Sequence, residues 1–263
     1  MAQFQCNIFS QTLEMIMQYN VIIPDGTTAE AKKDMPVVYL LHGLSDNASG
    51  WVRLTSIERY ARAKNCAVIM PEVQRSWYTD MKYGLRYFQF ISKDLKEVAR
   101  NYFGLPTDKA HSYIAGLSMG GYGALKTALR CPDEFEACAG FSSAIDLQKY
   151  LDKKMFFFPG EQIAIFGEEG KLKPEDNVYE LARKNAGNAN NPRFYITCGT
   201  KDILYPETLA LKEIMEKGGY KMEYWETVED HTWNFWDMCI KRALDFFLDK
   251  PAEDINDIPE VNK

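Results

Sequence analysis

The sequence predicts an α/β fold, with a mostly parallel central sheet that is flanked by helices on both faces. Continuous apolar runs of strand length, at residues 36–41 and 66–70, are typical of strands that are buried on both faces. Segments with apolar residues at helical spacing lie between such runs, as in the stretch from Tyr87 to Tyr102. Strands and helices that alternate along a chain predict parallel strands joined by right-handed crossovers.

The first part of the chain predicts an antiparallel pair of strands at one edge of the sheet. Apolar residues alternate loosely over residues 1–23, and Pro24-Asp25-Gly26 then forms a turn. The buried strand over residues 36–41 follows and ends in His42-Gly43. A helix is expected around residues 55–64, before the next buried strand.

The alternation continues through the second half of the chain. Further strands are expected at residues 113–115, 135–141, 193–198 and 221–228. Helices are expected at residues 121–130, from about Pro206 to Gly218-Gly219, and from Trp236 to Phe247.

One segment, residues 144–191, interrupts this alternation. We interpret it as a small lid-like insertion, a helical excursion above the strand ends that limits access to a site there. The sequence contains no linker and no internal repeat, so we expect a single domain over residues 1–263, with a polar tail at residues 251–263.

The composition argues against several classes of protein. The chain has 263 residues, of which 46% are hydrophobic, and a formal net charge of −6 without a basic stripe, so a nucleic-acid partner is not expected. No apolar run approaches the roughly 18 residues of a membrane span, and no signal peptide is visible, so we expect a cytoplasmic protein. The six cysteines show no zinc-ligand spacing; we expect reduced core thiols, no metal and no cofactor, and leave a homo-oligomer open.

The most informative motif is Gly116-Leu117-Ser118-Met119-Gly120-Gly121, which lies where an apolar strand meets a helical pattern. A small-x-Ser-x-small turn at such a junction is typical of a nucleophile elbow. Glycine is needed because the positions two before and two after the serine crowd against each other. A glycine-rich turn with a helix-capping serine is the alternative, but the flanking strand and helix favour a nucleophilic Ser118.

A nucleophilic serine needs an adjacent general base, and the chain offers three histidines. His111 begins the strand that ends at Ser118, about 20 Å away at strand rise. His42 ends a strand, and we expect it to order the following loop. His231 lies in the loop after the last predicted strand, so it is the predicted base.

The acid that orients the base is expected to be Asp202. It follows the strand at residues 193–198, and open α/β sheets build their sites at the carboxyl ends of strands. The order Ser118, Asp202, His231 is that of the α/β-hydrolases. Asp230 is the rival acid, but a residue adjacent to His231 does not easily reach its Nδ1.

The remaining site residues are expected from the loops around the elbow. The N–H groups of Met119, directly after the nucleophile, and of Leu44, in the loop after residues 36–41, are the predicted oxyanion donors. Trp51, Trp233 and the run Phe156–Phe158, with Phe157 as its central residue, are candidate substrate contacts, and ordinary core or lid packing is the alternative interpretation for each.

With these residues assembled, the chain resembles the esterase D branch of the α/β-hydrolases over nearly its whole length. The motifs that carry the resemblance are Leu40-Leu41-His42-Gly43 with Trp51 downstream, the elbow extended to Ala124, Cys198-Gly199-Thr200-Lys201-Asp202, and His231-Thr232-Trp233 followed by Phe235-Trp236. Bacterial tributyrin esterase and acetyl esterase-like proteins look most similar. Glu229-Asp230 departs from these relatives, which often place glycine before the histidine.

The resemblance implies the α/β-hydrolase fold and a serine carboxylesterase, with Ser118, Asp202 and His231 as nucleophile, acid and base. The expected partner is a small-molecule ester with a short acyl group, acetyl or butyryl, carbohydrate esters included. A feruloyl esterase and an S-formylglutathione hydrolase-like thioesterase are alternatives that use the same triad. A thioesterase of that kind would need a cationic pocket for the carboxylates of glutathione. An inactive binding protein on the same scaffold is the non-enzyme alternative.

Overall fold

A computed structural model describes residues 1–248, so the polar tail expected at residues 251–263 lies outside the described part of the chain. One eight-stranded sheet organises these residues, in the order β1-β2-β4-β3-β5-β6-β7-β8. Its strands are β1 (Ala2–Ser10), β2 (Met15–Ile23), β3 (Val37–Leu41), β4 (Ala67–Pro71), β5 (Ser112–Leu117), β6 (Ala137–Phe141), β7 (Arg193–Gly199) and β8 (Met222–Thr227).

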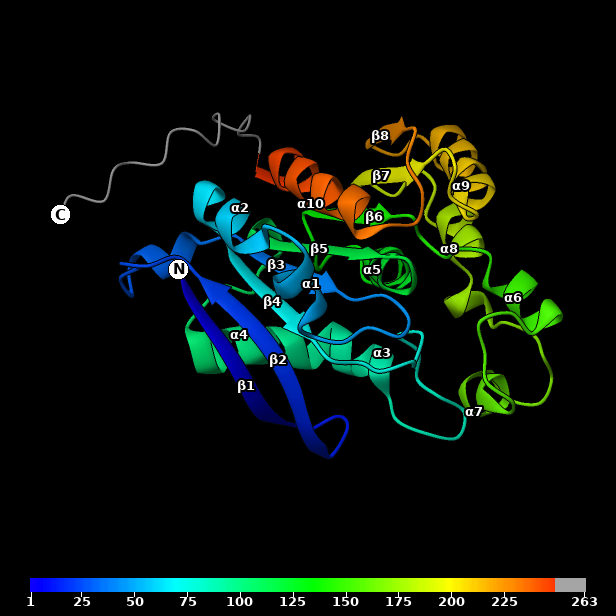
Figure 1. Cartoon of the computed structure of the whole chain (residues 1–263), viewed down its shortest axis with the longest axis horizontal. Coiled ribbons are helices and arrows are strands. Elements are labelled where there is room, and N and C mark those ends of the chain that lie inside the picture. Colours follow the sequence, from blue (N-terminus) through cyan, green and yellow to red (C-terminus); the bar gives the residue numbers. More distant parts are fainter. Residues whose placement is uncertain (249–263) are drawn as a thin grey trace.

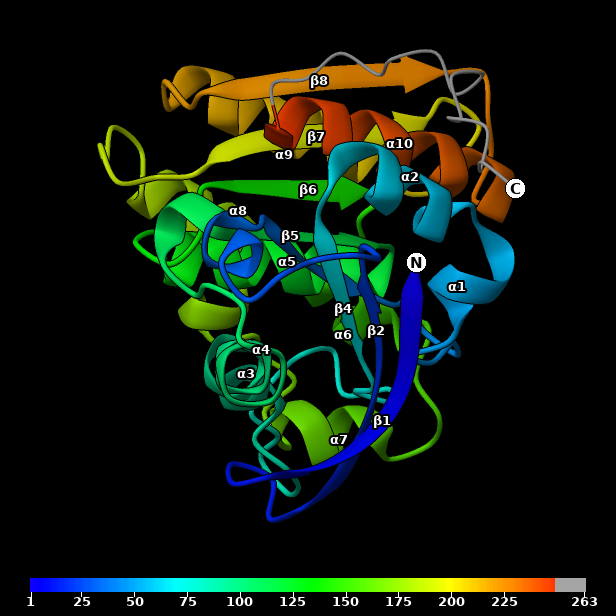
Figure 2. The same cartoon turned by 90° about the vertical axis from the view of Figure 1, so that its left-hand side faces the viewer.

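The predicted edge pair and the mostly parallel sheet are both confirmed. Strands β1 and β2 form an antiparallel hairpin, and β2 pairs antiparallel with β4. All the remaining pairs, from β4 across to β8, are parallel. The sheet is strongly twisted: in Figure 2 the strands β6 to β8 run nearly horizontally, whereas β1, β2 and β4 are steeply inclined.

Helices cover both faces of the sheet (Figure 1). Helices α2 and α10 pack against each other on one face, and α4, α5, α8 and α9 cover the other. The helices are α1 (Gly50–Leu54), α2 (Ile57–Lys64), α3 (Tyr87–Gln89), α4 (Leu95–Phe103), α5 (Met119–Arg130), α6 (Leu147–Lys153), α7 (Glu161–Phe166), α8 (Val178–Lys184), α9 (Tyr205–Lys217) and α10 (Trp233–Leu248). The predicted helix from Tyr87 to Tyr102 contains a π-helical turn at Phe90–Asp94, between α3 and α4.

Alternate residues of the parallel strands belong to two separate hydrophobic cores, one on each face of the sheet. In β3, Val37 and Tyr39 belong to the core under α4 and α5, whereas Val38 and Leu40 belong to the core under α2 and α10. All the residues of β3 are buried, and this two-sided burial explains the continuous apolar run in the sequence.

The excursion over residues 144–191 has two parts with different surroundings. Helix α8 packs against α5 and α9, so it covers the sheet, whereas α6 and α7 lie at the periphery (Figure 1). The junction between the two parts is fixed to α5 through the fully buried Lys126, whose Nζ lies 3.1 Å from the Asp176 carboxylate and donates to Thr79 Oγ1 at 2.8 Å. This buried ion pair anchors the peripheral segment to the body of the domain.

Candidate active site

Ser118 occupies a strained turn between β5 and α5, as the elbow motif predicts. Its backbone has φ +52° and ψ −117°, a conformation that residues with a Cβ adopt at a cost in energy. A Cβ on Gly116 would overlap the backbone of Gly120, and a Cβ on Gly120 would overlap the carbonyl groups at the end of β3. Both glycines are therefore needed for the close approach that presents Ser118.

The structure brings Ser118, His231 and Asp202 together in one hydrogen-bonded chain. The Ser118 hydroxyl lies 3.2 Å from Nε2 of His231, and Nδ1 of the same ring lies 2.8 Å from Asp202 Oδ2. The second carboxylate oxygen of Asp202 accepts the N–H of Leu204 at 2.9 Å. These distances lie within the range that proton transfer between a serine and a base requires.

The buried Asp202 carboxylate keeps its charge. Burial raises the pKa of Asp202, but the hydrogen bond and charge of His231, together with the Leu204 N–H, outweigh that effect and leave the pKa below its usual value. An ionised carboxylate at Nδ1 selects the tautomer whose hydrogen is on Nδ1. The lone pair on Nε2 is then free to accept the proton of Ser118.

The rival residues have other partners. Asp230 Oδ1 accepts the backbone N–H of His231 at 2.7 Å, so it caps the loop and does not contact the imidazole nitrogens. His111 pairs with Asp108 at the amino end of β5. Neither residue belongs to the chain of hydrogen bonds that begins at Ser118.

Leu44 and Met119, the predicted oxyanion donors, both belong to the surroundings of Ser118. Met119 is the first residue of α5, and Leu44 lines the same cleft as Ser118. Within residues 1–248, the backbone N–H groups of Leu44 and Met119 have no hydrogen-bond partner. Two unpaired donors beside a nucleophile suit an oxyanion, because donors that are already in place need no reorganisation when charge develops.

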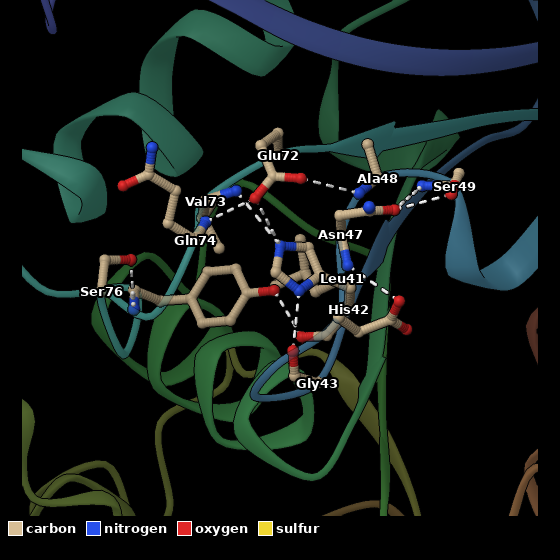
Figure 3. A network of polar contacts seen from close by, with 12 residues as sticks. Leu41, His42, Gly43, Asn47, Ala48, Ser49, Glu72, Val73, Gln74 and Ser76 are labelled. Atoms are coloured by element: carbon tan, nitrogen blue, oxygen red, sulfur yellow. Dashed lines mark hydrogen bonds and ion pairs between the residues drawn. The ribbon is translucent and has the colours of Figure 1, made fainter. Parts of the chain in front are cut away.

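His42 orders the loop that carries Leu44 (Figure 3). The imidazole is buried: Nε2 accepts the N–H of Val73 at 3.1 Å, and Nδ1 lies 2.8 Å from the carbonyl of Gly43. The Val73 N–H at Nε2 and the Gly43 carbonyl at Nδ1 favour the tautomer with its hydrogen on Nδ1, and Glu72 Oε1 lies 3.6 Å from Nε2. The hydroxyl of Tyr78 donates to the His42 carbonyl at 2.7 Å, so segment 72–78 supports the loop at two points.

Ser118 and His231 both line a cleft of about 570 Å³, a volume that includes its open mouth. It is lined by Leu44, Ser45, Trp77, Ser118, Ala144, Phe156, Ile203, Leu204 and His231. Most of these side chains are apolar, and none is a lysine, an arginine or a carboxylate. Such a lining suits an uncharged organic group.

Trp51, Trp233 and Phe157 are not among the residues that line this cleft, which differs from the sequence-based expectation. Trp51 is fully buried, and its indole N–H donates to the carbonyl of Leu41 at 3.0 Å. Trp233 stands edge-on to Trp51 at 5.3 Å between ring centroids. Phe157 packs on Trp77, at 5.5 Å between centroids, behind the cleft wall. Trp51 is a core residue, whereas Trp233 and Phe157 are partly buried and pack against Trp51 and Trp77 respectively.

The sequence reasoning missed Trp77, Ile203 and Leu204 as cleft residues. Two signals were available: residues 72–86 directly follow the carboxyl end of β4, and Leu204 lies two positions after the predicted acid. Loops at the carboxyl ends of parallel strands meet at one edge of the sheet, where the site lies. Within the predicted run Phe156–Phe158, Phe156 is the residue that lines the cleft, and its backbone has φ +68°.

Comparison with known proteins places the chain in a family. The model of the family described as "Putative esterase" matches residues 10–245. The chain belongs to this esterase family. A curated acetyl esterase from Caldicellulosiruptor saccharolyticus is 28% identical over 260 residues, which cover 94% of this chain and 98% of that protein.

Solved structures agree with this assignment. The fluorophosphonate-binding serine hydrolase FphF from Staphylococcus aureus superposes with a TM-score of 0.86 at 32% identity, covering 94% of this esterase and 98% of that chain. The S-formylglutathione hydrolase FrmB from the same organism gives a TM-score of 0.84 at 32% identity, with the same coverage. The α/β-hydrolase fold and the assignment as a carboxylic ester hydrolase are thereby confirmed. Among residues 1–248, no helix combines the length and apolar character that crossing a membrane requires.

Proposed function

We propose that this esterase hydrolyses short-chain acyl esters through an acyl-enzyme formed on Ser118. The Ser118 oxygen attacks the ester carbonyl, while His231 takes the hydroxyl proton and passes it to the departing alcohol. Asp202 holds the imidazole and stabilises its protonated form. Water then hydrolyses the acyl-enzyme by the same route. The observation that carries the proposal is the hydrogen-bonded chain Ser118–His231–Asp202 inside an apolar cleft.

The N–H groups of Leu44 and Met119 stabilise the oxyanion of each tetrahedral intermediate in this scheme. Their lack of other partners within residues 1–248 supports this role. Loss of one such donor typically costs about 10²–10³ in rate. The support that His42 gives to the loop then contributes to catalysis through Leu44.

The chemistry of the cleft supports an uncharged acyl ester as substrate. The nine lining residues include no lysine or arginine that would bind a carboxylate of the substrate. The acetyl esterase relative adds support for a short acyl group. Acetylated sugars fit the same description, since their acetyl group is small and uncharged.

A thioesterase acting on S-formylglutathione is the second candidate, and the 32% identity with FrmB favours it. The same triad serves an ester and a thioester. The two functions differ in how the leaving group is recognised, because glutathione carries two carboxylates and a simple alcohol carries none. The lack of a cationic lining residue is the reason for ranking the ester first.

Initial rates on a substrate series test the proposal. The series comprises p-nitrophenyl acetate, butyrate and octanoate, methyl ferulate and S-formylglutathione, with Ser118→Ala as the blank. We expect the highest kcat/KM on acetate or butyrate, and no turnover in the variant. A highest kcat/KM on S-formylglutathione or methyl ferulate would keep the triad and replace the substrate class.

The cytoplasm is the proposed location. All six cysteines are free, and Cys66, Cys138, Cys198 and Cys239 are buried. Unpaired thiols persist in reducing compartments, whereas oxidising compartments favour disulfides. Fractionation of the native host tests the proposal: recovery of the enzyme outside the cytoplasm would refute it.

A further inference from the structure

Arg75 connects two parts of the chain that both form the cleft. Its Nη1 donates to Ser45 Oγ at 3.1 Å, in the loop that carries Leu44. On the other side, Nε and Nη2 donate to the two carboxylate oxygens of Glu161 at 2.6 and 2.9 Å, and Nη2 also donates to the carbonyl of Phe156 at 2.7 Å. We call the four residues Ser45, Arg75, Phe156 and Glu161 the clasp.

The clasp acts directly on the cleft because two of its members line it. Ser45 and Phe156 both contribute to the lining, and Ser45 directly follows the predicted oxyanion donor Leu44. Glu161 strengthens the attachment of the excursion, because its carboxylate also accepts the N–H of Phe158 at 2.9 Å. The guanidinium additionally stacks over the Phe158 ring at 4.2 Å. One side chain thus connects the excursion to residues 42–49, which we call the oxyanion loop because they include Leu44.

The backbone on both sides of the clasp is strained. Ser45 has φ +67° and Phe156 has φ +68°, and neither is a glycine. Such left-handed conformations are unfavourable for residues with a Cβ and persist only where surrounding contacts hold them. The hydrogen bonds from Arg75 to the Ser45 side chain and to the Phe156 carbonyl are contacts of this kind.

Arg75 belongs to segment 72–78, whose backbone is held in place by other hydrogen bonds. The neighbouring Glu72 accepts the N–H groups of Ala48 and Gln74 at 3.0 and 2.7 Å (Figure 3). The N–H of Val73 donates to His42. Segment 72–78 is therefore attached to the oxyanion loop independently of Arg75, and the guanidinium is the part that reaches the excursion.

We propose that Arg75 is a positioning residue that sets the acyl-length limit of the cleft by holding Phe156 as its wall. This inference rests on the proposed ester hydrolysis. His231 protonates the leaving alcohol, so the alcohol lies on the side of Ile203 and Leu204, which adjoin Asp202. In this proposal the carbonyl oxygen faces the N–H groups of Leu44 and Met119, and the acyl chain extends along the part of the cleft that Phe156 lines.

The test is the ratio of kcat/KM for p-nitrophenyl octanoate to that for the butyrate. In Arg75→Gln we expect this ratio to rise about tenfold, mainly through the KM values, because the wall is released while the triad is untouched. Glu161→Gln weakens the ion pair in a nearly isosteric way but leaves the hydrogen bond from Arg75 to the Phe156 carbonyl, so a smaller shift in the same direction is expected. The double variant should shift no further than Arg75→Gln alone, since Glu161 acts on the wall through Arg75.

Arg183→Gln is the matched control. Arg183 forms an exposed pair with Glu180 at 3.2 Å on α8, within the same excursion but away from the cleft lining. Its ratio is expected to stay at the wild-type value. If Arg75→Gln does not fold, Arg75→Lys keeps the positive charge but not the planar guanidinium that donates to both oxygens of Glu161. It should give an intermediate ratio.

An unchanged ratio in Arg75→Gln or Arg75→Lys and in Glu161→Gln, with Ser118 still labelled stoichiometrically by a fluorophosphonate, would overturn the proposal. A lower thermal midpoint with an unchanged ratio would have the same meaning, because it assigns the clasp to stability alone. Failure of the proposed function gives a different result: wild-type enzyme that hydrolyses none of the esters, or Ser118→Ala that still does.

Discussion

The floor and the wall of the cleft are built in different ways. We call Ser118 and the Asp202 that supports it through His231 the floor; Ser118 directly follows β5, and Asp202 lies in the turn after β7, where its N–H donates to the Gly199 carbonyl at 3.1 Å. Phe156 and Ser45 belong to the wall, and they are held by a side chain from a third segment. The comparison teaches that the chemistry of this site is encoded in local motifs, whereas the shape of its pocket depends on contacts between distant segments.

The largest expected effect is the loss of activity when Ser118, in the floor of the cleft, is replaced. Ser118→Ala should lower kcat by at least about 10⁴, because the nucleophile is lost while binding and the oxyanion donors remain. The thermal midpoint should stay close to that of the wild type, since within residues 1–248 the Ser118 hydroxyl bonds only to His231. His231→Ala and the double variant should be about equally inactive. Esterase activity that survives in Ser118→Ala would refute the account.

The next effect identifies the acid. Asp202→Asn should lower kcat/KM by about 10³–10⁴, because an amide at Nδ1 allows the wrong imidazole tautomer. Asp230→Asn is the control, and it should stay within about threefold of the wild type because the Asp230 carboxylate accepts the backbone N–H of His231 and an amide oxygen can still do so. Parallel initial rates on p-nitrophenyl butyrate compare the two. The opposite ranking would make Asp230 the acid.

A smaller loss of kcat is expected from substitution of Trp236, which contacts the ring of His231. Its ring meets the His231 ring edge-on, at 4.8 Å between centroids and an interplanar angle of 87°. Trp236→Leu should lower kcat about tenfold, since His231 loses an aromatic neighbour that fixes its orientation. Trp236→Phe keeps an aromatic ring and should retain most of the activity. Equal loss in both variants would contradict an orienting contact.

The smallest expected effect is on the pH dependence of thermal stability, through the Arg75–Glu161 ion pair that holds the wall. Burial raises the pKa of Glu161, but the hydrogen bond and charge of Arg75 and the Phe158 N–H lower it below its ordinary value of 4.5. A carboxyl whose pKa is depressed on folding contributes stability above its unfolded pKa, and loses it as the pH falls through the folded pKa.

Differential scanning calorimetry between about pH 5 and about pH 3 tests this prediction. The thermal midpoint of the wild type should fall with acidification, and the fall should be smaller in Glu161→Gln by about 1–2 °C, as expected for a partly exposed pair in a domain of this size. Glu180→Gln, which alters the exposed pair with Arg183, should follow the wild type. Identical slopes in the wild type and Glu161→Gln would argue against the clasp as an ion pair.

The floor was predictable because its signals are local. The elbow glycines, the strand before Asp202 and the chain order of three residues are all visible in the sequence. Each buried strand appears as a continuous apolar run, as in residues 36–41, because both faces of the sheet are covered. The fold followed from the same pattern, including the antiparallel hairpin at its edge.

The wall was not predictable for a physical reason. Aromatic side chains occur in the core and in the cleft, and the sequence does not indicate which side of a loop each one faces. Trp51 is part of a recognisable motif, yet it is fully buried and bonded to the Leu41 carbonyl. Phe156 lines the cleft from a backbone with a positive φ; Arg75 holds its carbonyl, and its ring stands edge-on to Tyr150 at 5.0 Å between centroids. Arg75 and Phe156 are 81 positions apart in the sequence, so no local pattern indicates this contact.

Active-site titration with a fluorophosphonate, followed by peptide mapping, tests the central claim most directly. The account predicts one equivalent of label per chain on Ser118, with esterase activity lost in proportion to labelling. It also predicts that Ser118→Ala takes up no label. Label on a different residue, or full esterase activity after complete labelling of Ser118, would contradict the assignment of Ser118 as the nucleophile.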